Sequence, residues 1–117
     1  MYELSKADIE QLTDLVQRIE NFRGDRAINN LASEARHFLY EKKLTVHFDW
    51  PKWDEGREFF DVEGIQKYQK IDKEFVLKLL TAIARNDRFC EGAWAGLFKT
   101  GDGLALFRRL LEIETSE

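Results

Sequence analysis

The sequence predicts an all-α fold, an orthogonal bundle of five or six helices with one ordered aromatic loop, in a single helical domain over residues 1–117. Three observations predict it. Apolar residues recur at three- and four-residue steps along most of the chain, which is the pattern of amphipathic helices. The single extended stretch has no second strand to pair with. The length of 117 residues and the composition, 44% hydrophobic and 34% charged, suit one globular core.

The first two helices are each marked by an apolar face. The face of the first consists of Ile9, Leu12, Leu15, Val16, Ile19 and Phe22, and that of the second of Ile28, Leu31, Ala32, Ala35 and Leu39. Ser5 and Asp8 have the spacing of a capping box, which predicts the start of the first helix. Gly24 is expected to end this helix. The second helix is expected over residues 26–43, where Lys42 suits the negative end of the helix dipole.

Residues 45–50 are the one stretch whose pattern indicates an extended chain, because β-branched and aromatic residues follow one another there. Pro51 also disfavours the α conformation for Trp50. Since no partner strand is available, we expect an ordered loop that crosses the core. Residues 54–64 are expected to hold one or two helical turns.

The C-terminal half predicts three more helices. Asp72 is the expected N-cap of the first, whose apolar face consists of Phe75, Val76, Leu79, Leu80 and Ile83. Asn86 or Asp87 is expected to break the helix and cap the next one, which carries Phe89, Ala93, Trp94 and Leu97 and ends near Gly101. Asp102 starts the last helix, which turns Leu104, Phe107, Leu110 and Leu111 inward.

The charge and cysteine content exclude several classes of protein. The net charge of −4 argues against general binding to a phosphate backbone, for which a basic surface is expected. A single cysteine excludes an internal disulfide and fits a reducing compartment. The polar N-terminus does not resemble a signal peptide, and no apolar run reaches the roughly 20 residues of a membrane span. We therefore expect a cytoplasmic protein.

Residues 85–92 form the densest cluster of chemically active side chains. One hypothesis makes them a pocket that binds a small anionic ligand or hydrolyses a substrate, through Arg85, Asp87, Arg88 and Glu91. The other makes them a helix corner, in which Asp87 caps the following helix and Arg88 pairs with Glu91. We favour the corner, because a single Asp-Arg pair specifies no reaction.

No catalytic or metal-binding motif is present. Cys90 as a nucleophile would need a base, and the only histidines, His37 and His47, lie in no recognisable partner motif. Asp49 with the two histidines lacks the ligand spacing of a metal site. We therefore expect a protein that is not an enzyme and that has neither a metal nor another cofactor.

A second candidate site is acidic and aromatic. Residues 48–64 hold six acids and two bases, together with two of the three tryptophans. Aromatic residues are enriched in binding hot spots, which predicts a partner-binding surface formed by Trp50, Trp53, Asp54, Glu55 and Glu58. The competing interpretation is that the tryptophans cover the open end of a small bundle.

The chain also resembles a known family. Residues 79–92, with the run Asp87-Arg88-Phe89-Cys90-Glu91-Gly92, and residues 48–51 and 106–111 are similar to a family of unknown function, DUF6508, found in short bacterial and phage proteins. The resemblance covers about the C-terminal two-thirds of the chain and leaves the first helix outside. It implies no catalytic residues, and it suggests a setting in phages and other mobile elements.

These observations predict a non-enzymatic protein-interaction module. The expected role is that of a phage or mobile-element accessory protein that binds and inhibits a host nucleic-acid-binding or defence protein. The expected partner has a basic surface, and neither direct binding to nucleic acid nor a membrane is expected. A strong form of DNA mimicry is disfavoured, because 18 basic residues accompany the 22 acidic ones. The alternative is the small-ligand or hydrolytic site at residues 85–91, and the oligomeric state stays open.

Overall fold

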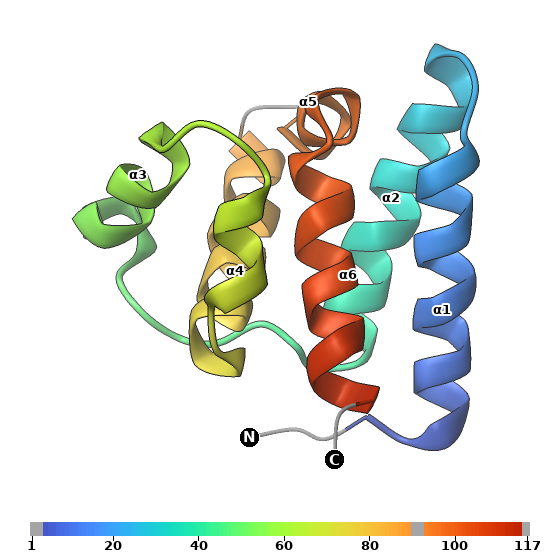
Figure 1. Ribbon diagram of the computed structural model, residues 1–117, viewed down its shortest axis with the longest axis horizontal. Helices are drawn as coiled ribbons and strands as arrows, with labels where there is room; N and C mark the ends of the chain where they lie inside the picture. Colours follow the sequence, from blue (N-terminus) through green and yellow to red (C-terminus); the bar gives the residue numbers. More distant parts are fainter. Residues whose placement is uncertain (1–3, 90–92, 116–117) are drawn as a thin grey trace.

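The computed structural model describes residues 4–89 and 93–115, and the side chains of residues 4–85 and 94–115. This part of the chain contains six α-helices, two short 3-10 helices and no strand, which confirms the all-α prediction. The elements are α1 (Lys6–Asn21), α2 (Asp25–Glu41), η1 (Trp50–Lys52), α3 (Asp54–Asp61), η2 (Gln66–Lys70), α4 (Lys73–Phe89), α5 (Ala93–Thr100) and α6 (Asp102–Thr115) (Figure 1).

The helices pack around α6. This helix lies against α1 on one side and against α4 and η2 on the other, while α5 crosses the end of the bundle (Figure 1). In the view of Figure 1, α5 is seen end-on and α6 from the side, so the bundle is orthogonal as expected. α3 stands at the outer edge, away from the other α-helices.

Local signals place most of the helix ends correctly. Asp8 N–H donates to Ser5 Oγ and Ser5 N–H donates to Asp8 Oδ2, each at 3.1 Å, which confirms the capping box. Asp72 caps α4 through a 2.9 Å bond from Phe75 N–H to its carboxylate. Gly24 does not end α1, which stops at Asn21, but precedes α2 as its N-cap with φ of +84°. A positive φ favours glycine in this tight turn between the two helices.

The expected break at Asn86 or Asp87 is wrong. α4 continues through both residues to Phe89, and α5 begins at Ala93, so Asp87 is not the N-cap of α5. The physical reason is that asparagine and aspartate are only a few tenths of a kcal/mol less favourable in a helix than most residues, about 0.7 kcal/mol below alanine at most. Each residue added to a formed helix gains a hydrogen bond, which outweighs that difference.

The core contains most of the predicted apolar faces, together with buried residues that the spacing did not assign, among them Phe38, Tyr68, Phe98 and Leu106. Its aromatic centre lies where α5 meets α6: the ring of Trp94 is 5.3 Å from Phe107 and 5.7 Å from Phe98, centre to centre. Trp94 and Phe107 are completely buried. Their burial together fixes the orthogonal crossing of α5 on α6.

The segment between α2 and η1 is an ordered loop, as expected. Val46 N–H donates to Thr81 Oγ1 of α4 at 2.8 Å, and the same hydroxyl donates to Leu77 O at 2.7 Å. Thr81 is 1% exposed, so this bond ties the loop to the core. The loop leads directly to η1 and α3, and it thereby sets where the aromatic stretch lies.

Candidate functional site

Aromatic side chains hold α3 against the bundle. Phe59 of α3 lies 5.1 Å from the ring of Phe75 in α4 and 5.2 Å from that of Tyr68 in η2. Trp53, at the start of α3, lies 5.3 Å from both Phe48 and Phe75. Each such ring pair contributes about 0.5–1.5 kcal/mol beyond its buried area, so the position of α3 depends on this aromatic cluster.

Lys67 holds the C-terminal end of α3. Its Nζ donates to the carbonyl oxygens of Phe59 at 2.9 Å and of Val62 at 2.6 Å, at the end of the helix. Phe59 O also accepts from the backbone N–H of Val62, at 3.2 Å. The same ammonium lies 5.0 Å from the centre of the Phe59 ring. A cation at the C-terminus of a helix also suits the helix dipole. Lys67 therefore has a structural role.

A groove of about 480 Å³ opens between α3 and the bundle. One wall consists of η1 and α3, and the other of α4 and α5. The residues that line it are mostly apolar: Trp50, Pro51, Trp53, Gly56, Arg57, Phe60, Ala82, Ile83 and Leu97. Trp53, Gly56, Arg57 and Phe60 follow each other at the spacing of one helix face, so α3 turns a single face into the groove.

Gly56 determines how Trp53 lies in this wall. A Cβ atom on Gly56 would be 2.4 Å from the Trp53 ring, so only glycine lets the indole approach α3 this closely. Trp53 is partly buried, with one side in the aromatic cluster and the other along the groove. It is therefore a wall of the groove and not a freely exposed anchor.

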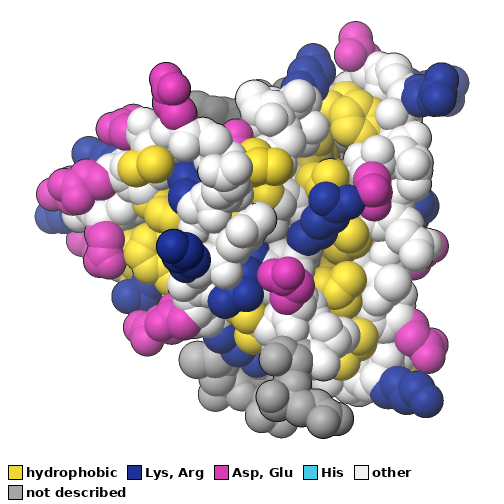
Figure 2. Space-filling view, in the orientation of Figure 1, with side chains coloured by type: hydrophobic (Ala, Val, Ile, Leu, Met, Phe, Trp, Pro, Cys, Tyr) yellow, Lys and Arg dark blue, Asp and Glu magenta, His cyan; other side chains and the backbone are white. Residues whose placement is uncertain are grey.

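Another face of α3 has a stripe of carboxylates, which we call the acidic stripe: Asp54, Glu58 and Asp61. Their spacing of four and three residues puts them in one row along α3, on the side away from Phe59, and all three are exposed. Figure 2 shows Asp and Glu side chains gathered over α3. Among the described residues, no basic side chain pairs with Glu58 or Asp61, and Asp54 has only an exposed contact of 3.8 Å with Arg57.

Arg57 is the only charged residue among the described residues that line the groove. Its guanidinium donates to the carbonyl oxygen of Pro51 at 2.5 Å and also approaches Asp54. The first contact joins α3 to η1, and the second is an exposed pair that contributes little. The groove thus combines an apolar lining with one arginine, and the acidic stripe lies on another face of α3.

The sequence of residues 4–116 matches the model of the Family of unknown function (DUF6508). The chain belongs to this family. The match includes α1, so the expectation that the first helix lies outside the resemblance is wrong. No curated protein and no solved structure matches the chain. None of the helices in the described ranges is both long and apolar enough to span a lipid bilayer.

Some of the residues proposed from sequence line the groove, and the others are exposed on α3. Trp50 and Trp53 line the groove, while Asp54, Glu55 and Glu58 lie exposed on α3. Sequence reasoning missed the other seven lining residues: Pro51, Gly56, Arg57, Phe60, Ala82, Ile83 and Leu97. The seven-residue step from Trp53 to Phe60 is a helix-face signal that could have found Phe60, whereas nothing local marks the residues of α4 and α5.

The alternative pocket at residues 85–91 is only partly described. The guanidinium of Arg85 lies 5.5 Å from the centre of the Tyr40 ring, a contact between α4 and α2. Asp87 and Arg88 belong to the last turn of α4, and their side chains lie outside the described residues, as do Cys90 and Glu91 altogether. Within the described part of the chain, no three His, Cys, Asp or Glu side chains converge as metal ligands.

Proposed function

We propose that this protein is a non-enzymatic interaction module whose groove binds an apolar anchor of a partner with a basic surface. One observation carries the proposal: an apolar groove of about 480 Å³ lies along one face of α3, and another face of the same helix has a stripe of carboxylates, two of which have no basic partner among the described residues. Anchor side chains of protein partners typically bury themselves in well-packed pockets of this kind.

The two halves of this surface have different roles in the proposal. Burial of apolar side chains in the groove contributes affinity, at roughly 25 cal/mol for each Å² removed from water. The acidic stripe accelerates the encounter with a positively charged partner and orients it, which affects the association rate more than the affinity. A partner must therefore present an apolar anchor to the groove and basic residues to the acidic face of α3.

Nucleic-acid-binding proteins commonly present basic surfaces, which is why they are the partner class named first. A nuclease of a host defence system, inhibited by a phage or mobile-element accessory protein in the cytoplasm, is the most specific form of this proposal. It is supported by the acidic stripe and by the absence of a catalytic motif from the sequence.

The proposal is tested on a partner captured from a bacterial lysate, with matched substitutions. Ala82→Leu fills the groove, whereas Ala27→Leu makes the same change in a different surface groove, between α1 and α2. Filling should weaken binding about tenfold or more, equal to at least 1.4 kcal/mol, and the control should leave it unchanged. Equal binding by both variants would exclude the groove.

A second pair of variants tests whether the acidic stripe guides the partner electrostatically. Glu58→Lys reverses a charge of the acidic stripe, and Glu10→Lys reverses an exposed glutamate of α1 that lies outside the stripe. At low salt, Glu58→Lys should slow association several-fold while Glu10→Lys does not, and high salt should remove the difference. Association that is independent of salt and of Glu58 would show that the stripe does not guide the partner.

A further inference from the structure

We infer that residues 47–65, which contain η1 and α3, form a lid that opens away from the bundle while the bundle stays folded, with Lys67 as its latch. We call this segment the α3 lid. Its opening belongs to the chain by itself and does not depend on the proposed function. Three features support it: the low burial of the segment, the contacts that hold it and the place of Lys67 between lid and bundle.

Two anchored residues bracket the α3 lid. Before it, Val46 N–H donates to Thr81 in α4, and after it the hydroxyl of Tyr68 donates to Asp102 at the start of α6. Within residues 47–65, all of which the structure describes, Gly56 is the only buried residue, and no core residue belongs to the lid. Segments with few buried apolar groups open at a lower free energy than the core, so the lid can open without unfolding the bundle.

Partly exposed rings hold the α3 lid against the bundle. Trp53 and Phe59 of the lid both meet Phe75 of α4, at 5.3 and 5.1 Å between ring centres. All three rings keep part of their surface exposed, unlike the completely buried rings where α5 crosses α6. Beside them, the groove of about 480 Å³ separates α3 from α4 and α5, so this side of the lid adds little packing.

Contacts within the lid make it open as one unit. Phe48 packs edge-on against Trp53 at 5.3 Å, and Arg57 donates to the carbonyl oxygen of Pro51, so η1 and α3 are joined to each other. An isolated helix as short as the eight residues of α3 is unstable in water. Once its rings leave the bundle, α3 therefore loses its helix, and its backbone amides become exposed together.

Lys67 joins the bundle to the lid at the C-terminal end of α3. It belongs to η2, next to the buried Tyr68, and η2 packs on α6. Its ammonium has three N–H groups, and Nζ lies 2.9, 3.3 and 2.6 Å from the carbonyl oxygens of Phe59, Phe60 and Val62. Because one side chain supplies all of these hydrogen bonds to the lid, its removal should favour the open state.

Opening of the lid removes the groove. Trp53 and Phe60 form one wall and belong to the lid, whereas Ala82 and Leu97 form the other and belong to the bundle. A molecule that contacts both walls binds only the closed state, and it shifts the equilibrium toward that state. The latch therefore controls the fraction of the protein in which the groove is formed.

Hydrogen exchange of the full chain, followed by NMR at urea concentrations below the unfolding transition, tests this inference. After correction for intrinsic rates, the amides of α3 should exchange together and at least about 100-fold faster than those of the buried Leu106 and Leu110 in α6. Their exchange should also depend less on urea, because opening of the lid exposes less surface than unfolding of the whole chain. Exchange of α3 at the rate and with the urea dependence of α6 would overturn the inference, as would α3 amides that exchange independently of one another and of urea.

Two matched lysine variants test the latch. Lys67→Met keeps an unbranched chain but removes the donors, whereas Lys70→Met makes the same change at an exposed lysine of η2 that has no partner among the described residues. Lys67→Met should speed exchange of the α3 amides about tenfold or more, a change of at least 1.4 kcal/mol, and leave the α6 amides unchanged. It should also increase quenching of tryptophan fluorescence by acrylamide, and Lys70→Met should have neither effect.

Three results with Lys67→Met would contradict its role as a latch. The first is unchanged exchange of α3, and the second is an equal acceleration in α3 and α6. The third is failure of the variant to fold, because the bundle is expected to stay folded when the lid is open. The urea series on the wild-type chain judges the lid separately from the latch.

Discussion

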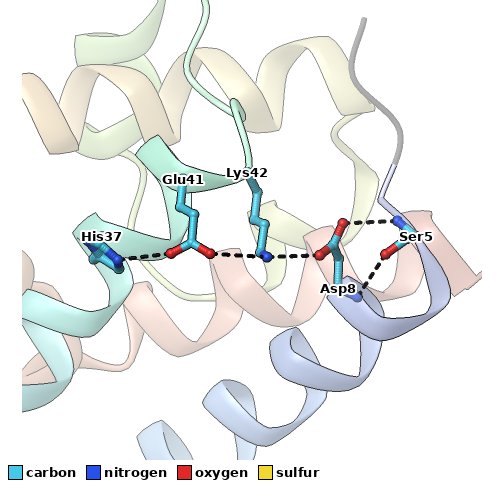
Figure 3. A network of polar contacts seen from close by, with 5 residues as sticks. All are labelled: Ser5, Asp8, His37, Glu41 and Lys42. Carbon is cyan, nitrogen blue, oxygen red and sulfur yellow. Dashed lines mark hydrogen bonds and ion pairs between the residues drawn. The ribbon is translucent and has the colours of Figure 1, made fainter.

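The ammonium of Lys42 lies 2.9 Å from a carboxylate oxygen of Asp8, and this ion pair joins the C-terminus of α2 to the N-terminus of α1 (Figure 3). The two side chains are only 16% and 11% exposed. The hydrogen bond from Lys42, followed by that from the backbone of Ser5, lowers the pKa of Asp8 to about 2. Asp8 raises the pKa of Lys42 in turn.

This ion pair predicts a specific acid sensitivity. The folded-state pKa of Asp8 lies below its ordinary value of 3.8, so the stabilisation is present above that value and is lost as the pH falls through about 2. Asp8→Asn should lower the melting temperature at neutral pH, and its difference from wild type should shrink between about pH 4 and about pH 2. Asp14→Asn, which removes an exposed pair with Arg18, is the control. A difference that stays constant with pH would contradict this assignment.

Thr81 is predicted to hold the loop before η1. Thr81→Val keeps the shape of the side chain but leaves Val46 N–H without its acceptor, which should lower the free energy of unfolding by about 1–3 kcal/mol. Thr13→Val is the matched control, because Thr13 donates only to Ile9 O within its own helix. Urea denaturation measures both variants. The prediction fails if the two substitutions lower the free energy of unfolding by the same amount.

Substitution by alanine should change the stability of the protein in opposite directions at two helical glycines. Gly56→Ala places a methyl group against the Trp53 ring and should destabilise the protein by about 1–3 kcal/mol, the usual range for overpacking. Gly96→Ala meets no described atom within 4 Å and should stabilise α5 by up to about 1 kcal/mol. Thermal unfolding gives the two signs, and near-UV circular dichroism reports the displaced indole. If both substitutions raised the melting temperature, the Trp53 ring would be able to move away from the new methyl group, and the predicted clash would be wrong.

Tyr68 is predicted to contribute stability that alkaline pH removes. Its hydroxyl donates to Asp102 Oδ1 at 2.9 Å, and burial, followed by the contact with Asp102, raises the pKa of Tyr68 above its usual value of 10. A raised folded-state pKa means that this stability is present below pH 10 and decreases as the pH rises further.

Tyr68→Phe should therefore cost about 0.5–1.5 kcal/mol or more at neutral pH, and its difference from wild type should shrink above pH 10. Tyr40→Phe is the control, since the buried hydroxyl of Tyr40 has no hydrogen-bond partner among the described residues. Urea denaturation at a series of pH values distinguishes them. An equal loss for both tyrosines would argue against the bond to Asp102.

The helices of this protein could be predicted because their signals are local. Ser5 and Asp72 cap helices through bonds to residues three positions away, and the apolar faces repeat within each helix. The same local reasoning failed at Asp87, where the difference in propensity is too small to stop a helix that has already formed. The acidic character of residues 48–64 also belongs to neighbours along the chain.

The groove was decided by tertiary structure. Trp53 and Phe60 are close in sequence, but Ala82 and Leu97 come from helices that face them only after the aromatic cluster has positioned α3. The contact of Asp8 with Lys42 likewise joins residues 34 positions apart. Sequence determines helix faces and charge because these depend on steps of three or four residues, whereas a concave site depends on how those faces pack against each other.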